Sequence, residues 1–396
     1  MVNTLSDVQI ILDVQKPAAP VELGELAIFM PAAAMNFKTY TAMDDLSADV
    51  TDPDVLKVAE GYFDQDEHYK DLAIISYNDV TKALDAYFNS GWEFATLAGA
   101  KPAAQTTTPP ANTSTTPTDS GSGDGKTDDS KPADGSDTGS GTSTTPAATP
   151  APEAAPAPAA DDAQTISNYI EIKKRRFFVE GLIATTDTAD NAADLSKKYD
   201  GNERTILFAS GTTQQEAEYG VGALIGELAN QVVGSITWKF KTLNGVKPTD
   251  YTQSQVNRMH DAGIFTYVSK AGIEQTSEGL TVSGEFIDAL HGDDWVKAEM
   301  ESQLQDLLSQ SKKISYDTAG IAEIKAVANT VLTTATANGI VLIDATTGKG
   351  TFTVTTVSRA DTPIEDIEKR QYNGMSFTYK RSGAIHAITV HGLVQL

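Results

Sequence analysis

The residue types best suited to chemistry gather between Asp288 and Asp294, in the stretch DALHGDD. Three carboxylates and the imidazole of His291 lie within these seven residues, and hard or borderline cations accept such ligands. The spacing does not match an EF-hand loop. A helix beginning near Trp295 with Asp293 or Asp294 at its N-cap explains the acids without a metal, because a helix N-terminus favours negative charge. We therefore expect no metal here; stoichiometric metal lost on Asp293→Ala would contradict this.

Three glycines, Gly220, Gly222 and Gly226, resemble a dinucleotide-binding fingerprint at first sight. Such a fingerprint lies at the turn from a strand into a helix, where backbone amides can bind a pyrophosphate. These glycines instead lie inside a helical pattern that begins at Gln214. We interpret them as small residues that allow close helix packing.

Other catalytic signatures are missing from the sequence. No serine lies in a G-x-S-x-G elbow, and neither a phosphate-binding loop nor an H-E-x-x-H motif occurs. The five histidines are scattered, and His386 and His391, on one predicted strand, would face opposite sides of it. We therefore expect no catalytic residue, no cofactor site, no metal site and no enzymatic activity.

The chain is strongly acidic, with 30 Lys and Arg residues against 54 Asp and Glu residues and a formal net charge of -24. An acidic surface repels phosphate backbones, which argues against a nucleic-acid partner. We interpret the basic run from Lys173 to Arg176 as a solvated helix end, where the helix dipole favours cations. The lack of cysteine removes disulfides, thiolate nucleophiles and cysteine-based metal sites.

Neither a secretory signal nor a membrane span is expected. Asp7, Gln9 and Asp13 interrupt the apolar residues near the N-terminus, and no basic region precedes them. No other segment approaches the roughly 20 apolar residues needed to cross a bilayer. We therefore expect no membrane partner and a protein made in the cytosol.

A long polar segment divides the first half of the chain. From residue 101 to residue 165 there is no Val, Ile, Leu, Met, Phe, Tyr or Trp, so nothing can offset the entropy of ordering. We predict a disordered insert rich in Pro, Thr, Ser and Ala, with its later part stiffened toward polyproline II. Insertion into one domain is favoured over a linker, because the flanking segments continue one alternation of strands and helices.

The elements around the insert predict an α/β domain with a largely parallel sheet. Buried strands are expected at 26–30, 72–77, 92–97, 177–185 and 205–209, and helices at 54–63, 80–88, 166–174 and 214–228. Asp79 occupies an N-cap position before the second of these helices.

After residue 234 the pattern changes and predicts a second, α+β domain. Strands are expected at 236–240, 265–269 and 280–287, and a hairpin joins 340–343 to 352–357 across Gly348 to Gly350. Two amphipathic helices present Val296, Met300, Leu304 and Leu307, and Ile321, Ile324, Ala328, Val331 and Ala335. The predicted divisions are an N-terminal arm (1–20), the α/β domain in two parts (21–100 and 166–234), the insert (101–165), the α+β domain (235–383) and a C-terminal arm (384–396).

The sequence pattern at both ends of the chain predicts β-strands. Near the N-terminus apolar residues alternate with polar ones, and the segment AIHAITVHGLVQL ends the chain without a polar tail. Unpaired strand edges seek partners, so these arms can add strands to sheets in neighbouring copies. Pairing of each arm inside its own subunit is the alternative. The candidate subunit-interaction residues are Val8, Ile10, Leu12, Val14, Ile385, Ile388, Val390 and Leu393.

The C-terminal half resembles the tail sheath proteins of contractile phage tails, in the compact form common among phages and prophages of Gram-positive hosts. The matching stretches lie in the family order at 236–252, 263–269, 277–296 and 312–341, and the closing RQYNGMSFTYKRSGAIHAITVHGLVQL at 370–396 is the most telling. The first hundred residues are similar in layout, whereas the polar insert departs from the pattern.

The resemblance implies a structural subunit that forms homo-hexameric rings, stacked helically around a tail tube and joined by exchanged arms. The implied partners are other copies, the tube protein, and baseplate and tail terminator proteins. The implied location is the virion, after assembly in the host cytoplasm. A phage tail, a bacteriocin and another contractile injection system remain alternatives, as do an enzyme or metal-binding protein using Asp288 to Asp294 and an adhesin with a glycosylated stalk.

Overall fold

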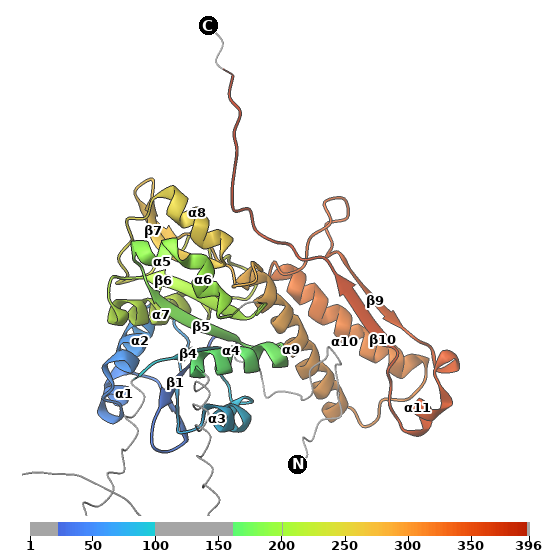
Figure 1. Ribbon diagram of the computed structural model, residues 1–396. Helices are drawn as coiled ribbons and strands as arrows, with labels where there is room; N and C mark the ends of the chain where they lie inside the picture. The colour runs from blue at the N-terminus through green and yellow to red at the C-terminus, as the bar shows by residue number, and fades with distance from the viewer. Residues whose placement is uncertain (1–22, 100–160, 200, 394–396) are drawn as a thin grey trace, which may run out of the picture. The chain divides into compact units, whose positions relative to one another are not determined.

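The computed structural model describes residues 23–99, 161–199 and 201–393 (Figure 1). Its largest element is an eight-stranded sheet with the order β2-β3-β1-β4-β5-β6-β7-β8. Six strands run parallel, and β2 and β8 add antiparallel edges. In sheet order the strands are β2 (Asn36–Tyr40), β3 (Leu72–Tyr77), β1 (Leu26–Pro31), β4 (Phe94–Leu97), β5 (Phe177–Ile183), β6 (Thr205–Ser210), β7 (Ile264–Lys270) and β8 (Ile273–Thr276).

The central strands are almost continuously apolar because helices cover both faces of the sheet. Leu26 and Ile28 of β1 pack into one hydrophobic cluster, and Ala27 and Phe29 pack into the other. The first face is covered by α1 (Met43–Asp49), α2 (Pro53–Phe63) and α7 (Gln214–Leu228). The second is covered by α3 (Val80–Tyr87), α4 (Asp162–Lys173), α5 (Thr186–Asp190), α6 (Ala192–Lys197) and α8 (Gln253–Asp261). The mixed α/β class expected from the sequence is confirmed.

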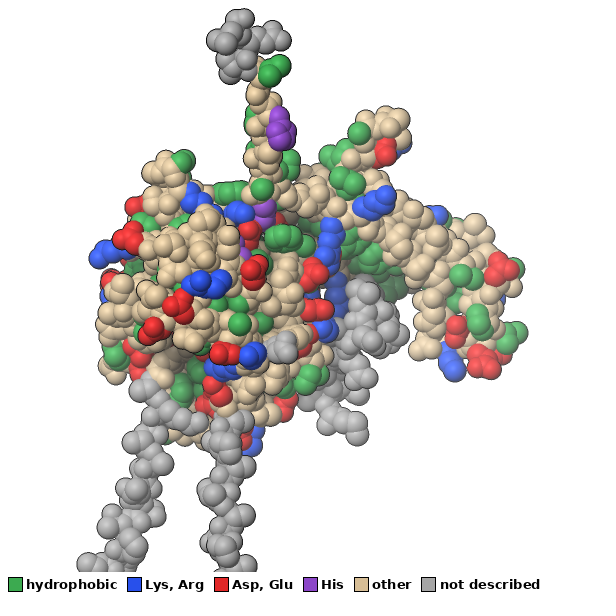
Figure 2. Space-filling view, turned by 45° about the horizontal axis from the view of Figure 1, so that its top comes forward, with side chains coloured by type: hydrophobic (Ala, Val, Ile, Leu, Met, Phe, Trp, Pro, Cys, Tyr) green, Lys and Arg blue, Asp and Glu red, His purple; other side chains and the backbone are tan. Residues whose placement is uncertain are grey.

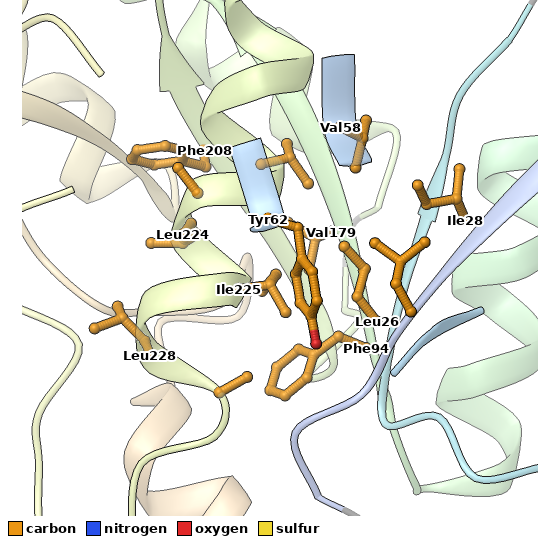
Figure 3. Packing of buried hydrophobic residues seen from close by; sticks show 14 of the residues in the cluster. Leu26, Ile28, Val58, Tyr62, Phe94, Val179, Phe208, Leu224, Ile225 and Leu228 are labelled. Carbon is orange, nitrogen blue, oxygen red and sulfur yellow. The ribbon is translucent and has the colours of Figure 1, made fainter. Parts of the chain in front are cut away.

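The helices α2 and α7 cross closely over the first face, and Figure 3 shows Val58, Tyr62, Leu224 and Ile225 packed there against strand residues. A methyl group on Gly222 would lie 1.9 Å from the carbonyl oxygen of Val58, and one on Gly226 would lie 2.6 Å from that of Tyr62. The interpretation of these glycines as packing residues is therefore confirmed.

Beyond the sheet, two long helices and a two-stranded sheet form a third hydrophobic cluster. α9 (Ile287–Gln310) packs on α10 (Thr318–Ala337) through Val296, Met300 and Leu304, as the predicted apolar stripes require. Val354 of β9 (Phe352–Thr356) also packs there, with β10 (Met375–Tyr379) antiparallel beside it. A 3-10 turn (Arg359–Asp361) and α11 (Ile364–Glu368) connect β9 to β10.

Several boundaries differ from the expectation. The sheet continues past residue 234, because β7 pairs with β6, so the predicted boundary at 234/235 falls inside the sheet. Residues 236–240 and 280–287 are not strands; each makes only isolated backbone hydrogen bonds. The partner of β9 is β10, and 340–343 contributes single bridges only. The predicted insert lies outside the described residues up to 160, and α4 begins within its last residues, at Asp162.

Candidate assembly site

The acidic stretch from Asp288 to Asp294 lies inside α9, which begins at Ile287. The prediction that Asp293 or Asp294 caps a helix near Trp295 is therefore wrong; Phe286 is the N-cap residue and makes no side-chain cap bond. Asp288, His291 and Asp294 follow one another at intervals of three and so lie along one side of the helix, whereas Asp293 lies on a different side. Among the described residues, no three acidic or imidazole groups come close enough to hold a metal ion together.

Asp294 fixes α9 to the sheet. Its carboxylate accepts two hydrogen bonds from the Arg204 guanidinium, one of them 3.0 Å long, and both side chains are only 8% exposed. Arg204 directly precedes β6, so the pair joins the end of a strand to the helix. Nearby, the ring of His291 is buried and its Nε2 donates to the carbonyl oxygen of Leu23, at 2.9 Å. Burial lowers the pKa of His291 to about 4, which keeps the ring neutral.

The basic run is a solvated helix end, as expected, at Lys173 and Lys174 but not at Arg176. Lys174 does pair at the surface with Glu171 and Glu203. Arg176, however, is buried beneath the Trp92 ring, with 4.1 Å between its guanidinium carbon and the ring centroid. The sequence contains no pattern from which the burial of Arg176 could be predicted. The only indication is that Arg176 directly precedes the buried strand that begins at Phe177.

The C-terminal arm is attached to the body of the chain at two points. Arg381 pairs with Asp293 and, at 3.5 Å, with Glu285. His386 lies deeper; its Nε2 is hydrogen-bonded to the Thr237 hydroxyl at 2.8 Å, and its Nδ1 lies 2.6 Å from a carboxylate oxygen of Glu278 without the geometry of a hydrogen bond. The sequence analysis missed the contacts of these two residues, because their partners lie 88 to 149 residues away in the chain.

Glu278, two residues after β8, joins His386 to Lys239. Its second carboxylate oxygen accepts a 2.6 Å hydrogen bond from Lys239, and the two side chains are 12% and 11% exposed. The ring of Phe286 packs edge-on against His386, with 4.9 Å between centroids. The first turn of α9 contributes Asp288, whose pKa is raised by burial and lowered in part by the Thr237 hydroxyl. A largely enclosed polar network therefore holds the base of the arm.

Past His386 the arm leaves the rest of the chain. Residues 384–393 belong to no helix or strand in the described part of the chain, and Ile385, Ile388, Val390 and Leu393 are 78%, 81%, 83% and 86% exposed. Figure 2 shows hydrophobic side chains along this projecting segment. In an extended strand, side chains at odd and even positions face opposite sides. One side would carry Ile385 and Leu393, and the other Ile388 and Val390. The candidate residues Val8, Ile10, Leu12 and Val14 lie outside the described residues.

The sheet of β9 and β10 has two open edges, since neither strand pairs with a third strand among the described residues. One face packs on α10 through Val354, with Met375, Phe377 and Tyr379 half-buried beside it. The other face is exposed and carries Thr353, Thr355, Ser376 and Thr378. Such edges present backbone donors and acceptors that can pair with another strand.

Within 23–99, 161–199 and 201–393, every helix is too short or too polar to cross a lipid bilayer.

The chain was compared with protein families and with solved structures. Residues 287–393 match the family described as E217 tail sheath protein gp31-like, C-terminal domain, from the first residue of α9 into the arm. No curated protein matches the sequence.

Solved structures match the whole chain in fold. A chain of the anti-feeding prophage (AFP) baseplate has a TM-score of 0.57 at 10% identity, with 100% of each chain covered. The contracted sheath complex of an extracellular contractile injection system, PVC, gives 0.60 at 10%, covering 99% of this chain and 98% of that chain. The contracted AFP helical sheath gives 0.55 at 10%, covering 100% and 99%. The resemblance to contractile tail sheath proteins is thereby confirmed: residues 287–393 match their C-terminal domain, and the whole chain has their fold.

Proposed function

We propose that this protein is the structural subunit of a contractile sheath, in a phage tail or a related injection system. The match of residues 287–393 to a tail sheath domain and the fold shared with sheath chains support this role. In the proposed assembly the subunits form hexameric rings that stack helically around a tail tube, between a baseplate and a tail terminator. The sheath would be assembled in the host cytoplasm and become part of the virion.

The observation that carries the proposal is the exposed apolar arm. The arm carries four large apolar side chains that are 78–86% exposed. Exposure of this apolar surface to water is unfavourable, so its burial against a partner would be favourable. An extended segment of this kind is suited to strand addition, in which main-chain hydrogen bonds supply affinity and alternate side chains supply specificity. We infer that the arm pairs with a neighbouring copy.

The open edges of β9 and β10 are the acceptor that we propose for the arms. Their backbone groups are unpaired among the described residues, and their inner face is already fixed on α10. A donated arm would extend an existing two-stranded sheet, which is marginal by itself, into a larger and more stable one. Repetition of this head-to-tail contact generates an open helical lattice in place of a closed dimer.

Contraction is the mechanical part of the proposal. If the lattice is built extended on the tube and held there by a barrier, its relaxation to a compact packing can do work on the tube. Strand-exchanged arms suit this motion, because their hydrogen bonds can persist while the bodies of the subunits reorient. The role requires no catalytic group, in keeping with a structural, non-enzymatic protein.

Electron microscopy of the purified chain before and after removal of residues 387–396 tests the proposal. This deletion keeps His386 and its partners, so the truncated subunit should remain folded. We expect sheath-like tubes from the full chain and only dispersed subunits from the truncated one, with unchanged circular dichroism. Tubes formed without the arm, or a full chain that stays monomeric at high concentration, would refute arm exchange.

A single substitution tests the backbone pairing more sharply. Thr389→Pro removes one N–H group from the arm, and a paired strand tolerates proline only where that N–H would face away from the partner strand. We expect it to impair tube formation, whereas Thr389→Ala leaves the N–H group in place and should assemble almost normally.

A further inference from the structure

Charged residues directly precede four neighbouring strands at the amino edge of the parallel sheet. In the sheet order β1, β4, β5 and β6 they are Glu25, Glu93, Arg176 and Arg204. Their exposed fractions are 3%, 1%, 2% and 7%. Charged side chains are rarely buried to this degree unless they are paired. The partners of each therefore show how this edge is stabilised.

The two arginines each have a partner, although the Nε of each has no hydrogen-bond partner among the described residues. Arg204 donates two hydrogen bonds to the carboxylate of Asp294 of α9, in a bidentate ion pair. Arg176 donates from Nη2 to the carbonyl oxygen of Ser90, at 2.6 Å, and its guanidinium lies against the Trp92 ring. Arg204 thus has a carboxylate partner, whereas Arg176 has a carbonyl oxygen and a ring, and burial lowers the pKa of Arg176 to about 9.

Glu93 differs from them. Neither of its carboxylate oxygens has a hydrogen-bond partner among the described residues, although both are buried. The side chain lines a small pocket with Asp294, so a second carboxylate lies on the same side. An ionised Glu93 bears the cost of desolvation and the repulsion of Asp294, and the neutral acid bears neither.

We propose that Glu93 is a proton-operated switch in the joint between the sheet and α9. In its neutral form Asp294 holds Arg204 without competition, and α9 is firmly attached. In its ionised form Glu93 competes with Asp294 for the guanidinium groups, and the attachment of α9 weakens. The groups around Glu93 are His291, Asp294, Lys297 and Glu301 of α9, Arg175 and Arg176 before β5, Arg204 before β6 and Glu25 before β1.

The direction of the pH effect follows from the environment of Glu93. Burial raises the pKa of Glu93 to about 7, Asp294 adds to the rise, and the neighbouring arginines oppose it. A glutamate in water has a pKa of about 4.3, so between these values the state with α9 attached holds a proton that the state with α9 detached, in which Glu93 meets water, has lost. The contribution of this group to stability is therefore present at mildly acidic pH and is lost as the pH rises toward 7.

Other buried groups titrate in the same range and must be separated from Glu93. Burial lowers the pKa of His260 to about 4, as it does for His291, and this favours stability at higher pH. Burial also raises the pKa of Glu218, on α7, to about 8. A comparison of the wild type with Glu93→Gln isolates one group, because glutamine has the same shape and no charge.

Hydrogen exchange of the α9 amides measures how often α9 detaches from the sheet. It is followed by mass spectrometry on the full chain and corrected for the intrinsic pH dependence of exchange. From about pH 5.5 to about pH 8 we expect the opening constant of α9 in the wild type to rise at least about tenfold relative to Glu93→Gln. Glu218→Gln is the matched control and should leave α9 like the wild type.

A ratio between the wild type and Glu93→Gln that does not change with pH would overturn the proposal, as would a change of the same size throughout the sheet. The rise in the wild type relative to Glu93→Gln should take place below about pH 7 and level off above it, and a ratio that keeps rising to about pH 9 would refute the switch.

Discussion

Two adjacent aspartates of α9 illustrate how burial sets the contribution of an ion pair to the stability of the fold. Asp294 and Arg204 are each 8% exposed, whereas Asp293 and Arg381 are 30% and 43% exposed. Loss of one partner from a buried pair leaves an uncompensated charge, but an exposed pair is screened by water and salt. The sequence places the two acids side by side and cannot distinguish them.

We predict that Asp294→Asn lowers the free energy of unfolding by about 3 kcal/mol or more, because Arg204 stays buried without its counter-charge. Asp293→Asn should cost about 1 kcal/mol or less. Guanidinium chloride unfolding of the two variants measures the difference directly. Equal losses would show that the Arg204 pair does not fix α9 to the sheet.

Elements with a regular apolar pattern could be predicted from the sequence. The strands around Ile28, Ile74 and Phe208 are buried on both faces, and the stripes of α9 and α10 meet as expected. Asp79 caps α3 through the backbone of Lys82. The misread segments at 236–240 and 280–287 are rich in strand-forming residues, but their bonds go to turns and to distant carbonyls. Strand propensity depends on the partner that a segment finds, which a single sequence does not specify.

The crossing of α2 and α7 depends on glycine at the points of contact. We predict that Gly222→Ala destabilises the chain by about 1–3 kcal/mol, because the added methyl group would meet the backbone of Val58, which cannot move alone. Gly292→Ala, in α9, is the control; its methyl group would lie 3.1 Å from a methyl carbon of Ile340, so it meets one side chain at a longer distance and no backbone atom.

Thermal unfolding of both variants measures the effect. Alanine is the better helix former by about 1 kcal/mol, so Gly292→Ala should be neutral or slightly stabilising. A Gly222→Ala variant as stable as the wild type would show that α2 and α7 can separate at little cost.

At the scale of the whole molecule, the polar segment interrupts the chain without interrupting the sheet. β4 precedes residues 100–160 and β5 follows them, and these strands pair in parallel. The lack of large apolar residues made the segment recognisable in the sequence. The extent of the sheet beyond residue 234 was not recognisable, because the sequence pattern changes there while the pairing of strands continues from β6 to β7.

We predict that replacement of residues 103–159 by about fifteen Gly and Ser residues leaves the fold intact and stabilises it by about 1 kcal/mol. The loop becomes roughly fourfold shorter, and each halving saves about 0.6 kcal/mol of closure entropy. The guanidinium chloride midpoint is the measurement. A marked loss of stability would mean that the segment contributes packing that its composition does not suggest.

The two-sided apolar character of the C-terminal arm limits how an assembly can begin. On the edge of β9 or β10 only one side of a donated strand would reach the α10 layer, since the outer side of that sheet is a wet surface of Thr and Ser. The remaining apolar side would stay in water until a third chain covers it. Small oligomers are then poorly favoured, and growth should show a lag and a critical concentration, with pre-formed fragments abolishing the lag.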